Sequence, residues 1–334
     1  MPCDNTSEFS NELSESIGFS NPPSIAVLIP CYNEELTIAK VITDFKRELP
    51  EAQVIVLDNN STDDTAEFAK QAGASVMQVS RQGKGAVVRY AFREIEADIY
   101  VMVDGDDTYS VKNVHDLIAP ISNGTHDMVI GDRGISEGDY AEKNKRAFHN
   151  FGNTLVRNLV NFCFNSDIKD VMTGYRAFSR RFVKNVPIIS DGFEVETEMT
   201  IRCLDRKLHI TTAPISYQDR PAGSFSKLNT LKDGFRVIKI IFTILKDFKP
   251  LLFFGSLSLI SLVFGLLAGL PVIAEFIKTS YITHIPLAIL ATGFVGVSVM
   301  LMSCALILDT MVSHERQKNE LQIVRFTKNS TDDV

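Results

Sequence analysis

Two carboxylates separated by a glycine give the chain its clearest chemical signal. Asp104, Gly105 and Asp106 directly follow the apolar residues 100–103. Carboxylate oxygens suit Mg²⁺ or Mn²⁺, and such an ion binds through one or two carboxylates together with phosphate oxygens of a substrate. The alternative is an acidic turn that caps the helix after Ser110. Because the acidic pair ends a predicted buried strand, we favour a metal site with Asp106 as direct ligand. Asp104 would either share the ion or hold the ribose and the metal-bound water, and Gly105 would give the loop close access to substrate.

A second signal is the glycine-flanked lysine in the segment Arg81–Gly85, which opens a predicted helix. A helix N-terminus offers backbone N–H groups and the positive end of the helix dipole, and Lys84 adds a full charge there. The spacing is not that of a Walker P-loop, so the glycine turn alone is weak evidence. In this context we expect Lys84 to contact an anionic ligand.

Further basic residues stand in three separate segments. Arg133 follows a predicted strand, Arg176 lies in a predicted turn, and Arg220, Ser226 and Lys227 precede an amphipathic stretch. Arginine forks suit phosphate oxygens, so we expect these segments to bind anions. The alternatives are ordinary surface arginines, and for the lysine an attraction to anionic lipid headgroups.

Two acidic residues open another predicted helix. Glu194 and Glu196 lie in the segment Gly192–Glu198. They could act as a general base or orient the arginines, and we favour orientation. The alternative is the ordinary preference of acidic residues for a helix N-terminus.

The elements that must position these residues alternate between short β-branched runs and amphipathic stretches. This pattern predicts an α/β fold with a mostly parallel, doubly wound sheet. In such a sheet ligands bind beyond the carboxyl ends of the strands, so the polar segments that follow three of them should converge. The predicted strands are residues 25–30, 54–58, 75–80, 99–104 and 128–131, and the predicted helices are residues 34–49, 63–71 and 84–95.

Three motifs, in this order and spacing, carry a resemblance to a known family. Pro30–Glu35, Asp58–Asp63 and Asp104–Asp106 resemble the motifs of family 2 glycosyltransferases, which have a GT-A fold. The likeness covers about residues 24–230. Within the family the chain looks most like polyprenyl-phosphate sugar synthases, including dolichyl-phosphate mannose synthase and bacterial lipid-linked glucosyltransferases. The Arg-x-x-Gly-x-Ser-Lys motif of those synthases departs here by one extra residue between Gly223 and Ser226.

The resemblance implies roles for the residues at the ends of the first two strands. It places Pro30, Tyr32 and Glu34 against the nucleoside and makes Asp58 the acid that binds the base. Asn33 and Glu34 can also cap the first helix.

The same resemblance implies an inverting single displacement with no covalent intermediate. A hexose would pass from a nucleotide diphosphate sugar to undecaprenyl or dolichyl phosphate. A phosphate monoester is largely a dianion at neutral pH, so it needs no general base to attack.

Two long apolar segments near the C-terminus predict a transmembrane hairpin. Residues 250–274 and 283–308 lack formal charges and exceed the roughly 20 residues that a spanning helix needs. A pair of buried core helices is the alternative. Basic residues flank the hairpin on both outer sides, which predicts that both termini are cytoplasmic. Glycines within the spans would allow close helix packing, including packing between protomers in a homo-oligomer.

The resulting domain organisation has five parts. We expect a flexible leader in residues 1–23, a catalytic domain in 24–227, an interfacial amphipathic segment in 228–249, the hairpin in 250–310 and a cytoplasmic tail in 311–334.

Composition excludes several other classes. The formal charge of −7 opposes nucleic-acid binding, and the five scattered cysteines have no CxxC spacing for a zinc or redox site. A processive polysaccharide synthase is disfavoured because the chain has no Trp, which the Gln-x-x-Arg-Trp motif of such enzymes requires. An inactive membrane scaffold is the alternative from another class, and the intact acidic and basic motifs argue against it.

Overall fold

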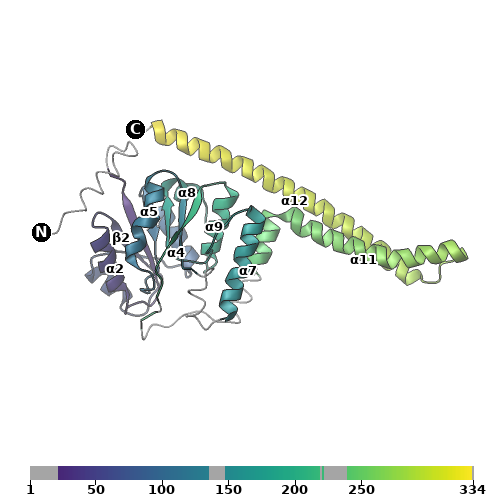
Figure 1. The fold of residues 1–334 in the computed structure, drawn as a ribbon, viewed down its shortest axis with the longest axis horizontal. Coiled ribbons are helices and arrows are strands. Elements are labelled where there is room, and N and C mark those ends of the chain that lie inside the picture. The colour runs from purple at the N-terminus through teal and green to yellow at the C-terminus, as the bar shows by residue number, and fades with distance from the viewer. Residues whose placement is uncertain (1–21, 135–146, 219, 222–238, 333–334) are drawn as a thin grey trace. The chain divides into compact units, whose positions relative to one another are not determined.

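The computed structural model describes residues 22–134, 147–218, 220–221 and 239–332 (Figure 1). The chain divides into two compact units, one of residues 1–237 with 322–334 and one of residues 238–321. Ser226, Lys227 and most of the expected leader lie outside the described residues, as does the first half of the expected interfacial segment. The predicted domain boundaries therefore stay predictions.

The first unit is built on a sheet of seven strands in the order β3-β2-β1-β4-β6-β5-β7. All neighbouring strands run parallel except β6, which is antiparallel to both β4 and β5. The predicted mostly parallel sheet is thus confirmed, whereas β6 and β7 were not predicted. The strands are β1 Ile25–Cys31, β2 Gln53–Asp58, β3 Ser75–Gln78, β4 Ile99–Met102, β5 Met128–Asp132, β6 Arg176–Ser179 and β7 Ile210–Pro214.

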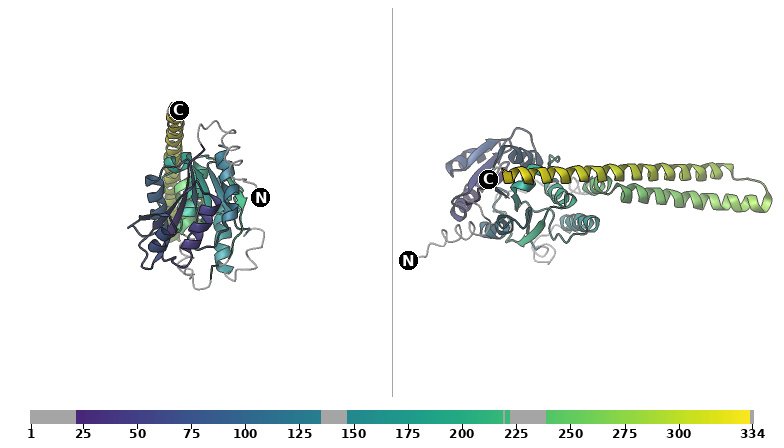
Figure 2. Two further views of the ribbon diagram at one scale, coloured as in Figure 1. Left: turned by 90° about the vertical axis from the view of Figure 1, so that its left-hand side faces the viewer. Right: turned by 90° about the horizontal axis from the view of Figure 1, so that it is seen from above.

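Helices cover both faces of this sheet (Figure 2). The α-helices of the unit are α2 Ile38–Glu48, α3 Thr65–Gln71, α4 Lys84–Glu94, α5 Val114–Ser122, α7 Ala147–Phe164, α8 Arg180–Asn185 and α9 Val195–Asp205. A short 3₁₀ turn, η1 Val111–Asn113, precedes α5.

Successive side chains along a strand point to opposite faces of the sheet, so each strand packs against helices on both sides. Val27 and Val101 point to the face that packs with α2, α3 and α5 in one buried cluster. Tyr100 points to the opposite face, where the Phe92 ring of α4 lies 6.3 Å from it and also contacts Phe182 of α8. Both faces are therefore covered, as expected for parallel strands that are apolar throughout.

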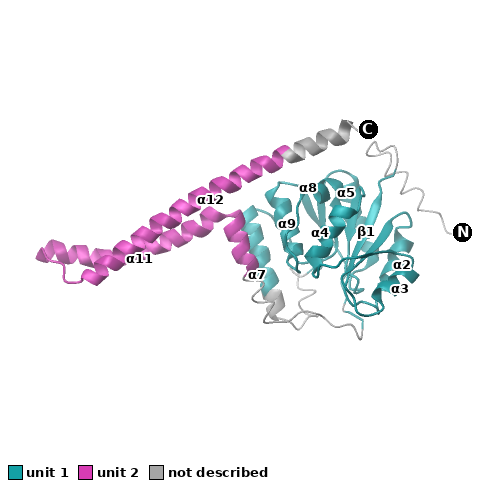
Figure 3. Cartoon of the chain, turned by 180° about the vertical axis from the view of Figure 1, so that it is seen from behind, with its two compact units in different colours: residues 1–237, 322–334 teal, residues 238–321 magenta. Residues whose placement is uncertain are grey.

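The second unit contains two long helices, and a helical segment that ends in a π-helical turn precedes them (Figure 3). The turn is η3 Ile244–Phe248, and the helices are α11 Pro250–Thr279 and α12 Ile285–Asp332, the last of which runs on past the unit. Both helices are long and apolar enough to cross a membrane, and most of their apolar surface is exposed within the structure. The two apolar helices of the predicted hairpin are thus present.

Small residues bring the two long helices together. The Ser258 hydroxyl donates to the Ser298 carbonyl at 2.9 Å, and the Ser261 hydroxyl donates to the Phe294 carbonyl at 2.8 Å. At Gly265 an added Cβ would lie 2.9 Å from the Val295 side chain. This glycine therefore serves packing within the hairpin, and packing between protomers stays a prediction.

Candidate active site

The loops after β1 and β2 are joined to each other by hydrogen bonds. The Asn33 amide donates to the Ser61 hydroxyl at 3.0 Å, and the Thr62 amide donates to the Asn33 side-chain oxygen at 2.8 Å. Asn33, Asn60 and Asp107 have φ of 54°, 61° and 56°, a left-handed conformation that Asn and Asp tolerate better than most residues. Each of the three polar segments contains one such residue, and all three follow the same edge of the sheet because β2, β1 and β4 are neighbouring parallel strands.

The loop after β4 lies close against β1, and this explains the glycine between the two carboxylates. A Cβ at Gly105 would lie 2.7 Å from the Cys31 sulfur. The Thr37 hydroxyl donates to the Gly105 carbonyl at 2.6 Å, which fastens the loop to the start of α2. A larger residue at this position would push the flanking carboxylates of Asp104 and Asp106 out of place.

Asp104 forms one end of a buried ionic chain. Lys84 Nζ lies 2.5 Å from Asp104 Oδ1 and 2.7 Å from Glu196 Oε1, and the side chains of Lys84 and Glu196 are 9% and 6% exposed. Burial opposes the charge on Lys84, yet the two carboxylates together raise its pKa above the usual value. Burial raises the pKa of Glu196, and Lys84 opposes that shift. Lys84 is therefore a fixed cation that orients Asp104.

Asp106 is held by two partners on different oxygens. Its Oδ1 accepts from the Thr108 hydroxyl at 2.6 Å, and its Oδ2 lies 2.6 Å from Arg220 Nη2. Arg220 also lies 3.7 Å from Glu34 Oε1. Burial raises the pKa of Asp106, and the neighbouring charge of Asp104 adds to that effect. Concentrated negative charge of this kind favours a bound cation.

The expected nucleoside-binding residues end the two adjacent strands β1 and β2. Cys31 pairs with Asp58 in the register, so the segment Pro30–Glu34 lies beside Asp58. Asp58 is buried, and one of its oxygens accepts from the Ser61 amide at 3.2 Å. The Tyr32 side chain is partly exposed. These residues are in position to form one binding surface, and their ligand stays a prediction.

The backbone N–H groups of the Arg81–Gly85 loop, which we expected to face an anionic ligand, are bonded to protein groups. The Gly85 amide, at the start of α4, donates to the Asp191 carbonyl at 3.0 Å, and the Gly83 amide donates to Asn59 Oδ1 at 2.7 Å. A Cβ at Gly83 would overlap the Asp191 carbonyl oxygen, so the glycine permits this close contact. The helix N-terminus is therefore occupied by protein groups.

Arg176 is also placed differently from the expectation. It is fully buried at the start of β6 and donates to the carbonyls of Thr173 and Val171 and to the Thr200 hydroxyl. Burial lowers its pKa to about 10. In this structure the guanidinium supports the loop that holds Gly174, and the predicted phosphate contact of Arg176 stays a prediction. That glycine in turn leaves room for the Asp104 carboxylate, which a Cβ there would meet at 2.4 Å.

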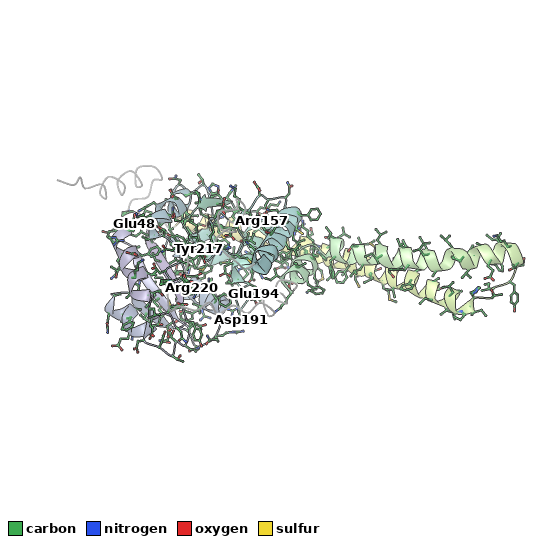
Figure 4. The ribbon with its side chains drawn as sticks, turned by 60° about the horizontal axis from the view of Figure 1, so that its bottom comes forward. Glu48, Arg157, Asp191, Glu194, Tyr217 and Arg220 are labelled. Carbon is green, nitrogen blue, oxygen red and sulfur yellow. The ribbon has the colours of Figure 1, made fainter. Side chains whose placement is uncertain are left out.

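Arg133 and Glu194 are two further predicted site residues, and each has protein contacts of its own. Arg133 forms two hydrogen bonds, of 2.6 and 3.1 Å, to the fully buried Asp170 carboxylate, and its guanidinium lies over the Tyr217 ring. Glu194 precedes α9 and folds back onto Gly192. Tyr217, Glu194 and Arg220 are labelled in Figure 4.

The predicted metal ion fits this site if substrate phosphates and water supply part of its coordination. Among the described residues, no three His, Cys, Asp or Glu side chains form a metal cage. Asp104 and Asp106 alone would supply two carboxylates, which suits an ion completed by substrate phosphates and water. The local charges agree with this, because the carboxylates of Asp104, Asp106, Glu196 and Glu34 gather around the two cations Lys84 and Arg220.

Sequence reasoning missed three residues that shape the site. Asn59 joins the loops after β2 and β3 through bonds to the Val79 and Arg81 carbonyls. Asp170 pairs with Arg133. The Tyr109 hydroxyl accepts from the Gly174 amide at 3.1 Å, and burial raises its pKa to about 12. Of the three, only Asn59 lies in a motif that the sequence had singled out.

Comparisons with known proteins identify the family. The model described as glycosyl transferase family 2 matches residues 26–186. The chain is 35% identical over 298 residues to glycosyltransferase AglJ of Haloferax volcanii, covering 89% of this chain and 96% of that protein. It is 30% identical over 217 residues to a dolichyl-phosphate hexose transferase of the same organism, covering 65% of this chain and 92% of that protein.

A solved structure supports the fold. Glucosyl-3-phosphoglycerate synthase from Mycobacterium tuberculosis, in complex with Mn²⁺, UDP-glucose and phosphoglyceric acid, superposes with a TM-score of 0.55. The likeness covers 71% of this chain and 83% of that one at 24% identity, so it bears on the fold alone. With its sheet, its acidic loop and these relatives, the chain belongs to glycosyltransferase family 2, in which it resembles the polyprenyl-phosphate sugar synthases.

Proposed function

We propose that this glycosyltransferase moves a hexose from a nucleotide diphosphate sugar to a polyprenyl phosphate, with inversion and with the help of Mg²⁺ or Mn²⁺. The observation that carries the proposal is the pair Asp104 and Asp106 at the carboxyl end of β4, beside the cations Lys84 and Arg220. A site of this kind suits a reaction in which one diphosphate leaves and one phosphate attacks.

On the donor side, each residue has a distinct role. Tyr32, Glu34 and Asp58 would hold the nucleoside at the ends of β1 and β2. Asp104 and Asp106 would hold the metal, which when bound neutralises the charge of the leaving diphosphate. Asp104 can do this in a fixed orientation because Lys84 holds one of its oxygens at 2.5 Å.

On the acceptor side, the lipid phosphate attacks the anomeric carbon from the face opposite the diphosphate. Arg220 would serve on this side, with Arg133 as a further contact, and Ser226 and Lys227 stand beyond Arg220 in the sequence. Their positive charge would hold the acceptor in line with the leaving group. The lipid acceptor is supported by the two apolar helices and by the relative named for its dolichyl-phosphate substrate.

The test is a transfer assay with the purified full chain. Polyprenyl phosphate and Mn²⁺ are combined with a panel of radiolabelled nucleotide sugars, and the organic phase is analysed by mass spectrometry. We expect a lipid phosphate that carries one sugar, and no product from Asp106→Ala. A product with many sugars on one lipid would instead indicate a processive synthase. Absence of labelled lipid with every donor would refute the proposal.

A further inference from the structure

Arg220 occupies the oxygen of Asp106 that a metal ion would use. Oδ1 of Asp106 accepts from the Thr108 hydroxyl at 2.6 Å and from the Thr108 amide at 3.3 Å. Oδ2 is the oxygen that remains, and Arg220 Nη2 lies 2.6 Å from it. A divalent cation on Oδ2 would therefore compete with the guanidinium for the same lone pairs and the same small volume.

The two cations of the site differ in how firmly they are held. Lys84 lies in the first turn of α4 between two carboxylates, and its side chain is 9% exposed. Arg220 follows β7 outside any helix or strand, and its side chain is 29% exposed. Removing Lys84 from its place would leave Glu196 buried beside Asp104 without its cation, whereas Arg220 can turn toward solvent or toward a ligand. Arg220 is thus the cation that an incoming metal displaces most easily.

We propose that Arg220 is a built-in counter-cation of Asp106, which it neutralises in the ligand-free enzyme and leaves when the metal and donor bind. The inference rests on the proposed function, because it uses the same metal site. It goes further by giving Arg220 two successive partners, first a carboxylate and then phosphate oxygens. No bond is made or broken in the exchange, in which one cation replaces another on Oδ2.

The exchange sets an order of events at the site. While Arg220 is paired with Asp106 and lies near Glu34, its guanidinium faces carboxylates and is not turned to a phosphate. Once a metal holds Asp106, the like charges repel and the guanidinium is available to anions. Arg220 then becomes a phosphate-binding group only after the donor side is filled, which favours binding of donor before acceptor.

The experiment measures Mn²⁺ binding to the full chain in detergent by electron paramagnetic resonance, without nucleotide. Arg220→Gln removes the competing charge, so we expect Mn²⁺ to bind about tenfold more tightly, which corresponds to about 1.4 kcal/mol. Arg220→Lys keeps the charge and should lie closer to the wild type than to the Gln variant. Arg180→Gln is the matched control, because Arg180 pairs with Glu96 in an exposed ion pair away from the acidic loop. Unfolding temperatures establish that each variant is folded.

Three further outcomes decide the matter. Adding Asp106→Asn to Arg220→Gln should abolish the gain, because the carboxylate that both cations share has lost its charge. Mn²⁺ affinity that is unchanged or weaker in Arg220→Gln would overturn the inference. That result would leave the proposed function standing if wild-type enzyme still binds Mn²⁺ with nucleotide sugar. No Mn²⁺ binding by the wild type under either condition would instead refute the metal site itself.

Discussion

Replacing Lys84 by Met should destabilise the first unit strongly, because this lysine is the shared cation of two carboxylates. Lys84 and Glu196 are 9% and 6% exposed and their charged atoms lie 2.7 Å apart, while Asp104 is 2.5 Å away on the other side. Removing one partner from a buried ion pair costs about 3–5 kcal/mol. For a domain of this size each kcal/mol lowers the unfolding temperature by roughly 2–4 °C, so we expect a decrease of about 6–20 °C.

The assay is differential scanning calorimetry of the full chain in detergent at one scan rate, with Lys40→Met as the control. Lys40 pairs with Asp107 at 2.6 Å and with Asp44 at 3.1 Å, but its side chain is 59% exposed. An exposed pair of this kind contributes at most about 1 kcal/mol. Both variants lose a lysine with two acidic partners, so the difference between them isolates the effect of burial.

The loss in Lys84→Met should also depend on pH. Burial already raises the pKa of Glu196 in the folded protein, and removal of Lys84 takes away the main influence that lowers it. A carboxyl with a raised folded pKa destabilises the fold at high pH and ceases to do so once it is protonated. The difference in unfolding temperature between Lys84→Met and the wild type should therefore be smaller at pH 5 than at pH 7.5. Adding Glu196→Gln to Lys84→Met should restore part of the lost stability. The reasoning would be refuted if Lys84→Met lowered the unfolding temperature no more than Lys40→Met does, or if its difference from the wild type grew on acidification.

Two other predictions concern catalysis and topology. Asp106→Ala should abolish sugar transfer in the lipid extraction assay while keeping the unfolding temperature near that of the wild type, and excess EDTA should have the same effect; full activity in EDTA would defeat the metal assignment. Reporters fused to Met1 and Val334 should both lie on the cytoplasmic side, whereas a cysteine at Tyr281 should react with an impermeant reagent from the opposite side; a Val334 reporter on that opposite side would show that only one helix spans.

Much of the sheet could be predicted because its central strands carry their own signal. The strands β1, β2 and β4 are short apolar runs that end in polar segments, and parallel strands buried on both faces have such sequences. β6 and β7 have no such run. β6 is four residues long and contains Arg176 and Ser179, and its place between β4 and β5 comes from pairing with distant strands. The residues around β6 in the sequence therefore do not reveal which strands it pairs with.

The same distinction applies to the site. The acidic residues could be found because they follow strands directly, and the ends of neighbouring strands must meet. The pairing of Lys84 with Glu196 could not be predicted, because the two residues are over a hundred positions apart in the sequence. Glu196 belongs to α9, which comes after β6 along the chain. The Asp191 carbonyl, which accepts from the Gly85 amide at the start of α4, is likewise over a hundred residues away from that helix in the sequence. Local sequence identified these groups as charged or polar, and only the fold decided that they bind each other.

The arginines show why residue type alone is a poor guide to role. A guanidinium that has to meet a substrate anion needs access to solvent, and Arg176 has none because it is fully buried and protein groups already accept its hydrogen bonds. Lys84 is likewise committed to Asp104 and Glu196. These two cations organise the loops that carry the carboxylates. We therefore expect contact with the acceptor phosphate to depend mainly on Arg220 and on residues beyond it, because Arg133 is only 10% exposed and is paired with Asp170. Arg220 alone among the four combines partial exposure with a direct contact to Asp106, so it is the residue through which the donor and acceptor halves of the reaction can be coupled.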